Sequence, residues 1–419
     1  MTDQASRAPG PGGWGSGRMA GFGSTIFAEM TALAVRTGAR NLGQGFPDSS
    51  GPPELLAAAC AAIMSGRNQY PPLHGLPELR TAIADQRAAE YGTRYDPDSE
   101  ILVTMGATEA IAAALLALCA AGDEVIVFEP YYDSYAAMIA MAGGVRRPVL
   151  LEFTGGRFRF DADQLRRVVT PKTRILLLNS PHNPTGTVFD RAELAAIAAV
   201  CQEHDLIAIT DEVYEYLIYD GEHTPLATLP GMDSRTLTIS SAGKTFSSTG
   251  WKVGWTCGPP PLIAAVAAAK QFLTFAGGTP FHAAVAEGLR NCLPWVARQR
   301  DDLRRRRDLL AGLLGEAGVR TYPSQATYFL QIDARSFGHD DGATLCRELP
   351  GQAGVVAIPS VEFYDTKDAG RHLVRLAFCK SDDVLTDAAR RLGDYAGRVA
   401  ASSAADDGPA DSLPLLPGE

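Results

Sequence analysis

Residues 240–255 read SSAGKTFSSTGWKVGW and lie between two β-rich runs, TLTIS (236–240) and KVGWTCG (252–258). This arrangement predicts that Lys244 lies on a short loop at the end of a strand, with no carboxylate near it in sequence. Burial beside other cations lowers the pKa of an amine, so a lysine presented in this way is a candidate Schiff-base nucleophile. A lone lysine is more often an ordinary surface residue, and the interpretation therefore depends on the rest of the chain.

Two more residues of the same stretch are suited to holding a phosphate. Ser241 precedes Lys244 by three positions and Lys252 follows it by eight, which places a hydroxyl and a cation on the same segment. The stretch thus offers a nucleophile together with a candidate anion site.

The region before this stretch alternates between apolar strand-like runs and helix-like runs. The expected strands are ILVTMG (101–106), EVIVFEP (124–130), TRILLLNSP (173–181) and LIAITDEVY (206–214). The helix-like runs between them are ATEAIAAALLALCAAG (107–122), SYAAMIAMAGG (134–144) and ELAAIAAVCQEHD (193–205). Such alternation predicts an α/β fold in which helices cover a largely parallel sheet. Ligands of such folds bind beyond the carboxyl ends of the strands.

The loops at these strand ends carry candidate binding residues. In MGATEA (105–110), the free amides of a helix start and the Thr108 hydroxyl would form an anion site, although a simple helix cap has the same pattern. NSPHNPTGTVF (179–189) is dense in turn formers, and Asn183 precedes Pro184 where a cis peptide bond is favourable. Asn183 could donate to a ligand oxygen, or the loop could be a rigid turn without a ligand.

Two charged residues lie in apolar strands. Asp211 ends the run LIAIT, and a carboxylate at a buried strand end is costly unless it is paired. Arg375 lies between Val374 and Leu376, inside HLVRLAFCK (372–380), so its guanidinium group needs an anionic partner. A helix cap for the aspartate and a structural salt bridge for the arginine are the alternatives to ligand binding.

Taken together, these motifs resemble those of the fold-type I, pyridoxal-phosphate (PLP)-dependent aminotransferases of class I/II. The similarity is strongest to the branch of the kynurenine, glutamine and methionine aminotransferases and to actinobacterial N-succinyldiaminopimelate aminotransferases. It covers Thr25 to Leu392, and the NPTG string (183–186) is a specific signature. The resemblance implies a large domain with a mostly parallel seven-stranded sheet between helices, plus a smaller α+β domain.

The resemblance also implies roles for individual residues. Lys244 would hold the cofactor covalently and move the substrate's α-proton. Asp211 would pair with the protonated pyridine nitrogen, which makes the ring an electron sink. Asn183 and Tyr214 would donate to the phenolic oxygen. The other implied contacts are to the phosphate (Ala107, Thr108, Ser241, Lys252), to the ring face (Tyr132) and to the substrate's α-carboxylate side (Phe27, Gly45, Asn183, Arg375).

A homodimer with shared active sites is a further implication. Tyr70 and Thr279 would reach the cofactor phosphate of the partner subunit, and Phe275 would lie near its substrate. Many relatives carry a histidine after this phenylalanine, whereas the present chain has Ala276, which argues against a kynurenine-type aromatic substrate.

Composition excludes several other classes. The 419 residues suffice for two domains, and 46% hydrophobic and 21% charged residues are typical of a globular protein. The net charge of −10 argues against binding to nucleic acid or to a membrane. The seven cysteines are widely spaced and form no CxxC pair, so we expect neither a disulfide framework nor a metal site. No apolar run of membrane-spanning length and no signal-peptide pattern occurs, so we expect a cytoplasmic protein.

The same patterns predict a domain organisation. Both ends of the chain are rich in Gly, Pro, Ser or Ala, which indicates disordered tails. The predicted organisation comprises a disordered tail (1–24), an N-terminal arm that joins the small domain (25–50), the large PLP-binding domain (51–292), the small C-terminal domain (293–398) and a second disordered tail (399–419).

The predicted function is transfer of an amino group from an amino acid to a 2-oxo acid, 2-oxoglutarate. The expected donor is N-succinyl-diaminopimelate, in lysine and diaminopimelate biosynthesis. The alternatives are a methionine, glutamine or aromatic (kynurenine-type) aminotransferase, a cysteine-conjugate β-lyase and a biosynthetic aminotransferase for an unusual amino acid. A cofactor-sensing transcription regulator of the same fold would need a DNA-binding domain, for which the segment before Thr25 is too short.

Overall fold

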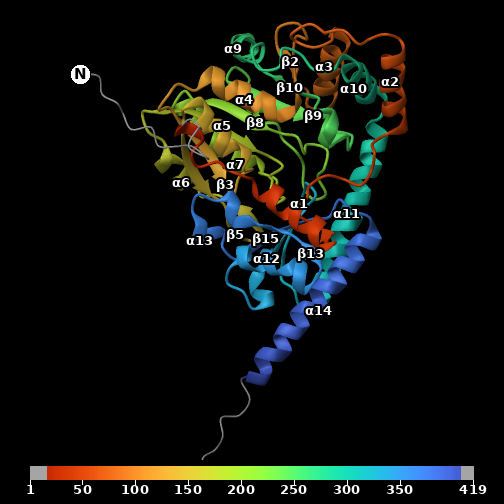
Figure 1. Cartoon of the computed structure of the whole chain (residues 1–419). Helices are drawn as coiled ribbons and strands as arrows, with labels where there is room; N and C mark the ends of the chain where they lie inside the picture. The colour runs from red at the N-terminus through yellow and green to blue at the C-terminus, as the bar shows by residue number, and fades with distance from the viewer. Residues whose placement is uncertain (1–16, 407–419) are drawn as a thin grey trace, which may run out of the picture.

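The computed structural model describes residues 17–406, and the side chains up to residue 402 (Figure 1). Its centre is a seven-stranded sheet whose strands lie in the order β2 (Ile101–Thr104), β10 (Gly254–Cys257), β9 (Thr236–Ser241), β8 (Ile207–Asp211), β7 (Thr173–Asn179), β3 (Glu124–Glu129) and β4 (Val145–Leu150). Only β10 runs antiparallel to its neighbours in this sheet. The prediction of a mostly parallel seven-stranded sheet is therefore confirmed.

Helices cover both faces of this sheet, which explains why its strands read as continuous apolar runs. Successive side chains of β3 alternate between the faces: Val125 and Val127 join the apolar cluster of α4 and α5, whereas Ile126 and Phe128 join that of α6 and α7. The helices of this part are α2 (Pro53–Met64), α3 (Pro77–Tyr91), α4 (Gly106–Leu118), α5 (Ser134–Ala142), α6 (Ala162–Val168), α7 (Arg191–Glu203), α8 (Ala242–Thr245), α9 (Pro260–Lys270) and α10 (Thr279–Asn291), and a hairpin of β5 (Glu152–Thr154) and β6 (Arg157–Arg159) follows β4.

A second, smaller sheet forms the lower part of the molecule in Figure 1. Its antiparallel strands lie in the order β11 (Thr321–Tyr322), β12 (Phe329–Asp333), β15 (Leu373–Ala377) and β14 (Ile358–Pro359). The helices of this part are α11 (Leu293–Glu316), α12 (Gly342–Gln352), α13 (Lys367–Gly370) and α14 (Asp382–Asp406). Strand β15 carries Arg375 to the boundary between the two parts.

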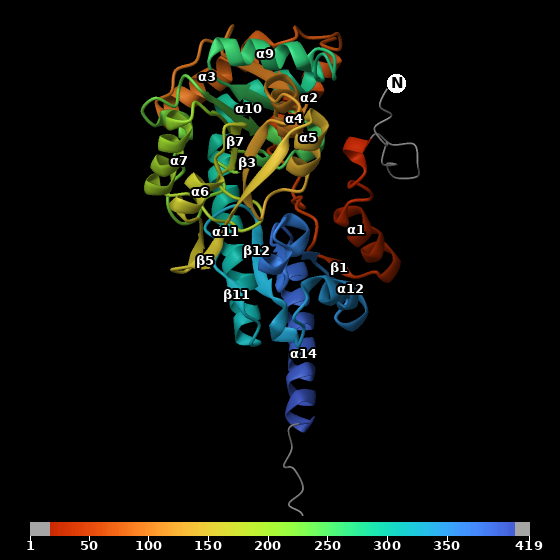
Figure 2. The same ribbon diagram turned by 90° about the vertical axis from the view of Figure 1, so that its left-hand side faces the viewer.

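The N-terminal segment joins this smaller part. Helix α1 (Ile26–Thr37) begins where the Thr25 side chain accepts a hydrogen bond from the Ala28 amide, and it ends at Gly38 with φ 65°. Strand β1 (Arg40–Asn41) then pairs in parallel with β13 (Val355–Val356). Figure 2 shows α1 beside α12, and Met30 of α1 is buried in the same apolar core as the small sheet.

Both predicted tails lie partly outside the described residues, namely at 1–16 and 407–419. For 399–406 the prediction of disorder is wrong, because these residues continue α14; alanine, the strongest helix former, supplies half of them. Residues 17–24 are also anchored: Phe22 packs on the apolar cluster beside α5, and Arg18 Nη1 donates to the Met141 carbonyl at 3.3 Å. Within 17–406 no helix has both the length and the apolar character that a membrane span requires.

Candidate active site

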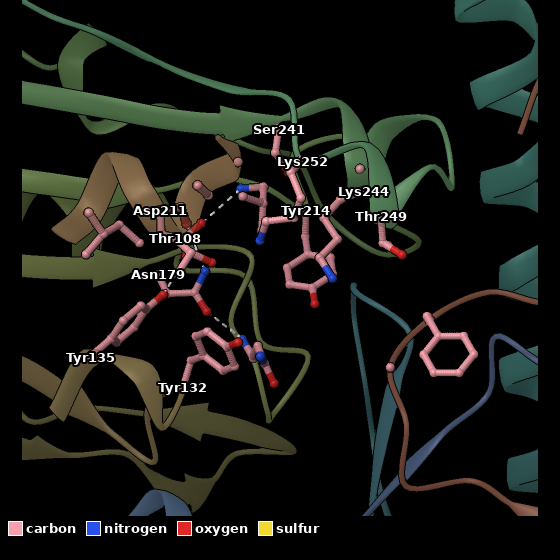
Figure 3. Close-up of a pocket in the computed structure, with 18 of the residues that line it drawn as sticks. Thr108, Tyr132, Tyr135, Asn179, Asp211, Tyr214, Ser241, Lys244, Thr249 and Lys252 are labelled. Carbon is pink, nitrogen blue, oxygen red and sulfur yellow. Dashed lines mark hydrogen bonds between the residues drawn. The ribbon is translucent and has the colours of Figure 1, made fainter. Parts of the chain in front are cut away.

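A cavity of about 390 Å³ opens beyond the carboxyl ends of β7, β8 and β9, and arm residues and β15 close it (Figure 3). Its wall includes all of the predicted site residues except Tyr70, Phe275 and Thr279. The predicted residues that line it are Phe27, Gly45, Ala107, Thr108, Tyr132, Asn183, Asp211, Tyr214, Ser241, Lys244, Lys252 and Arg375.

Lys244 lies on α8, the single turn of helix that follows β9. Its Nζ donates a hydrogen bond to the Tyr328 hydroxyl at 2.7 Å. Burial lowers the pKa of this amine to about 8, and the nearby cations Arg375 and Lys252 act in the same direction. About a tenth of the amine is therefore neutral, and so nucleophilic, at pH 7, far more than for an ordinary lysine.

Asp211 ends β8 and is 6% exposed. Its carboxylate accepts hydrogen bonds from two neutral donors, the Tyr135 hydroxyl at 2.5 Å and the Val213 amide at 3.3 Å. Burial raises the pKa of Asp211 to about 6. A cation placed against this carboxylate would relieve the burial penalty, and a protonated ring nitrogen is such a cation.

A chain of amide groups connects this strand end to the small sheet. Asn179 Nδ2 donates to the Asp211 carbonyl at 2.8 Å, and Asn179 Oδ1 accepts from the Asn183 amide at 2.7 Å. Asn183 Oδ1 in turn accepts from Arg375 Nη1 at 3.0 Å. The Asn183–Pro184 peptide bond is cis, as the sequence favoured.

Arg375 is 2% exposed and has neutral partners. Besides Asn183, its Nη2 donates to the Gly43 carbonyl at 3.1 Å, and its guanidinium group lies 4.0 Å from the centre of the Phe329 ring. Its Nε has no hydrogen-bond partner among the described residues. Burial lowers the pKa of Arg375 to about 10, so the group stays cationic at neutral pH. The expected anionic partner is thus not a carboxylate of these residues, and a ligand carboxylate fits.

The opposite end of the cavity suits a phosphate. Helix α4 starts at Gly106 with φ 74° and without a side-chain cap, so the amides of Ala107 and Thr108 are free to donate. Lys252, with φ 56°, brings its Nζ to 3.5 Å from the position that a Cβ on Gly106 would take. Figure 3 shows Ser241 and Lys252 at this end and Tyr132 at the other.

Comparison with known proteins agrees with this geometry. The family model "aminotransferase class I and II" matches residues 38–392. The chain belongs to this family. It is 53% identical to a Mycobacterium tuberculosis protein named a probable N-succinyldiaminopimelate aminotransferase, over 91% of this chain and 99% of that one. The Escherichia coli methionine aminotransferase is 40% identical over 88% of this chain and 96% of the relative.

A solved structure extends the likeness to three dimensions. The N-succinyldiaminopimelate aminotransferase from Mycobacterium tuberculosis superposes with a TM-score of 0.89 at 54% identity, covering 90% of this chain and 99% of that chain. Class I and II aminotransferases depend on PLP, and the prediction of a PLP-dependent transaminase is confirmed. The donor set fits this cofactor: a helix start with uncapped amides, a low-pKa lysine and a buried carboxylate without a cationic hydrogen-bond partner.

The three predicted residues outside the aminotransferase cavity lie on another face. Tyr70 is 84% exposed and its ring meets that of Phe275 edge to face, 5.9 Å away. The Thr279 hydroxyl donates to the Gln69 carbonyl within the chain. These residues form one group, and their roles across a dimer stay a prediction.

Several cavity-side residues escaped the sequence analysis. Tyr135 lies in the helix-like run SYAAMIAMAGG (134–144), but only the structure shows that its hydroxyl reaches Asp211. Tyr328 and Phe329 lie in a segment that reads as an ordinary strand, ATYFLQIDA (326–334). No local signal separates them from core residues, because their contacts depend on the packing of the small sheet against the cavity.

A polar cluster lies on the other side of β8 from the cavity. Glu212, Glu215 and His223 bring metal-ligating atoms within 4.8 Å of one another. The Arg87 guanidinium already pairs with both carboxylates, at 3.3 and 3.2 Å, and His223 Nε2 lies 3.0 Å from Glu212. The cluster is a buried ion-pair network that supports the strand carrying Asp211.

Proposed function

We propose that this enzyme transfers the amino group of N-succinyl-diaminopimelate to 2-oxoglutarate, in lysine and diaminopimelate biosynthesis. The observation that carries the proposal is 53% identity over nearly the whole chain to a relative named for that substrate, together with a matching cavity. Arg375 supplies the cation that a substrate α-carboxylate needs.

Each wall of the cavity would then perform one task. Ala107, Thr108, Ser241 and Lys252 would hold the cofactor phosphate, Tyr132 would contact the ring of the cofactor, and Asn183 and Tyr214 would donate to the phenolic oxygen of that ring. Asp211 keeps the ring nitrogen protonated. When bound, PLP supplies an electron sink for the pair left on the substrate's α-carbon.

Lys244 performs the proton transfer in this scheme. Its neutral Nζ removes the α-proton, becomes an ammonium group and later returns that proton at the end of the amino transfer. Asn183 Oδ1 and the Gly43 carbonyl hold the guanidinium group of Arg375, whose remaining N–H groups would bind the α-carboxylate and fix the α-carbon in reach of Lys244. Phe27 and Gly45 complete the carboxylate side.

A donor panel tests the proposed substrate. Purified holoenzyme is given N-succinyl-diaminopimelate, methionine, glutamine, kynurenine or a cysteine conjugate with 2-oxoglutarate, and glutamate formation is measured. We expect kcat/KM for N-succinyl-diaminopimelate to exceed each of the others by about 100-fold, since polar recognition discriminates strongly. A higher value for another donor would overturn the substrate proposal, and product from the cysteine conjugate without 2-oxoglutarate would point to a β-lyase.

Methionine is the second candidate, because Phe27 and Phe46 give part of the cavity an apolar wall and the methionine aminotransferase is a close relative. The polar wall residue Gln44, whose Nε2 donates to Thr31, keeps a side-chain oxygen that can accept a hydrogen bond, and this favours the succinylated donor, whose distal groups need hydrogen-bond partners. The same panel separates the two.

We further propose a homodimer in which Tyr70, Phe275 and Thr279 serve the site of the partner subunit. The exposed rings of Tyr70, Phe272 and Phe275 form an apolar surface that a second copy would cover. Light scattering on a sizing column should give twice the chain mass of 44.5 kDa, and Phe272→Glu should lower it.

Two further parts of the proposal concern organisation and location. The arm (25–50), large domain (51–292) and small domain (293–398) agree with the two sheets and their separate apolar cores, and limited proteolysis should cut first in the loop between β1 and α2 that joins the arm to the large domain. A cytoplasmic location agrees with seven free cysteines and is tested by cell fractionation.

A further inference from the structure

Tyr328 occupies the point where the catalytic lysine and the arm meet. It is 1% exposed, and its hydroxyl donates to the Gly45 carbonyl at 2.6 Å, accepts from Lys244 Nζ at 2.7 Å and also forms a side-chain hydrogen bond with Tyr214. A phenol has one hydrogen to donate, and the carbonyl can only accept it. The lysine must therefore be the donor in its own contact with Tyr328.

This direction of the hydrogen bond matters for the chemistry of Lys244. A neutral amine that donates one N–H to Tyr328 still has its lone pair available to another atom. Nζ lines the cavity, and the hydrogen bond to Tyr328 occupies one of its three positions, so the lone pair takes one of the other two and can be presented to the space that the substrate would fill. The ammonium form can keep the same hydrogen bond after it has gained a proton.

The backbone before Tyr328 is held in an unusual conformation. Thr327 is β-branched yet has φ 71°, a left-handed value that costs such a residue energy and that persists where the surroundings enforce it. Its amide donates to the Leu217 carbonyl at 2.8 Å, and its carbonyl accepts from the Tyr219 hydroxyl. Strained residues of this kind gather at functional sites.

The turn at Thr327 directs two neighbouring side chains to two functional groups. Tyr328 reaches Lys244, and Phe329 lies under the Arg375 guanidinium, 4.0 Å from it. Gly45 fits between the two rings: a Cβ there would lie 2.6 Å from Phe329 Cζ and 3.1 Å from Tyr328 Cε2. The tripeptide thus links the lysine, the arginine and the arm.

We propose that Tyr328 is a positioning residue for Lys244: it holds the freed amine, directs its lone pair to the substrate's α-hydrogen and ties that geometry to the arm through Gly45. The inference rests on the proposed role of Lys244 as proton carrier and not on which donor is used. In the step, the α-carbon–hydrogen bond breaks, an N–H bond forms on Lys244, and the electron pair stays at the α-carbon, where bound PLP would serve as its electron sink. Tyr328 gains and loses no proton.

The variant Tyr328→Phe removes only the hydroxyl. We expect kcat to fall about 10- to 100-fold, with KM changed less than about threefold, because positioning acts on the transition state more than on binding. The deuterium isotope effect with an α-deuterated donor should rise, since proton removal becomes slower. The acidic limb of the kcat profile should move to lower pH, because the ammonium form loses an acceptor.

The matched control is Tyr322→Phe. Its hydroxyl donates to Asp333 on the same small sheet and is distant from the cavity. If Tyr328→Phe lowers only thermal stability, as we expect of Tyr322→Phe, and gives no larger isotope effect, Tyr328 is only structural. Values of kcat and isotope effect within about twofold of wild type would also overturn the inference.

A second measurement needs no substrate. The rate at which apoenzyme takes up PLP, followed by visible absorbance, reports the attack of Lys244. We expect Tyr328→Phe to slow this uptake by about tenfold below pH 8, where few amines are neutral and orientation matters most. Equal uptake rates would contradict the inference. If Tyr328→Phe slows PLP uptake but no amino donor reacts with the wild-type enzyme, the proposed function is wrong and the positioning role of Tyr328 still holds.

Discussion

The Asn183 side-chain oxygen accepts a hydrogen bond from Arg375 Nη1 across 3.0 Å, which joins a loop of the large sheet to a strand of the small one. Asn183 is itself fixed through Asn179 to the end of β8. The arginine is therefore placed by the same polar chain that places Asp211. Substrate carboxylate and cofactor nitrogen would be held by one connected network.

Arg375→Lys should lower kcat/KM for amino donors by about 100-fold, because an ammonium group cannot bridge a carboxylate in bidentate fashion. Most of the loss should appear in KM. Steady-state kinetics with the preferred donor measures this change. Arg305→Lys, on an exposed face of α11, is the matched control and should act like the wild type.

Lys244→Ala should abolish turnover and remove the visible absorbance of the bound cofactor. In the wild-type apoenzyme, uptake of PLP should speed up as the pH rises toward about 8 and level off above it, because only the neutral amine attacks. Stopped-flow absorbance between pH 6 and pH 9.5 would measure this. A rate that keeps rising through pH 10 would show that the amine is not perturbed. Lys172→Ala, at the surface, serves as control.

Asp211 gives a prediction for stability. Its folded pKa of about 6 lies above the ordinary value of 3.8, so the native apoenzyme keeps this proton longer than the unfolded chain does. Stability should therefore fall as the pH rises from about 4 to about 6, by up to roughly 3 kcal/mol from this group. Asp211→Asn should lack this component in urea unfolding of the apoenzyme.

The same substitution should reduce turnover of the holoenzyme by about 100-fold or more, since a neutral amide cannot keep the ring nitrogen protonated. The turnover of the holoenzyme reports the cofactor role of Asp211, and the stability of the apoenzyme reports how much the burial of this carboxylate destabilises the fold. If the apoenzyme of Asp211→Asn is less stable than the wild-type apoenzyme at pH 7.5, the stability prediction is wrong.

Arg87→Met should destabilise the fold by about 3–5 kcal/mol, because Glu212 and Glu215 would be left as buried carboxylates without their cation. Chemical unfolding at pH 7.5 measures the change. Adding Glu212→Gln and Glu215→Gln to the variant should recover part of the loss. If the double addition recovers nothing, the loss comes from packing of the arginine stem.

Periodicity and local motifs were sufficient to predict much of this fold. The strand and helix runs between residues 101 and 214 alternate because each buried strand must be covered on both faces. This alternation can be recognised from the sequence alone. Asp211 and Arg375 could be selected because a charge inside an apolar run needs a partner. Their contacts with Tyr135 and Asn183 could not be derived from spacing.

The position of Tyr328 was beyond prediction for a different reason. It depends on the left-handed backbone of Thr327, which a β-branched residue adopts only under constraint from distant segments such as the one at Leu217. The helical extension of α14 to Asp406 was missed because a small-residue composition was taken as a sign of disorder. A segment rich in alanine can be either helical or disordered, depending on whether it has a packing partner.

Strands β9 and β10 pair antiparallel, with Gly254 directly opposite Ser241, so the intervening twelve-position loop starts and ends at one place. Lys244 stands near its first stem and Lys252 near its second. Lys244 and Lys252 thus belong to one closed segment between two paired strand ends. A residue inserted into or removed from this segment would therefore change the positions of both lysines together.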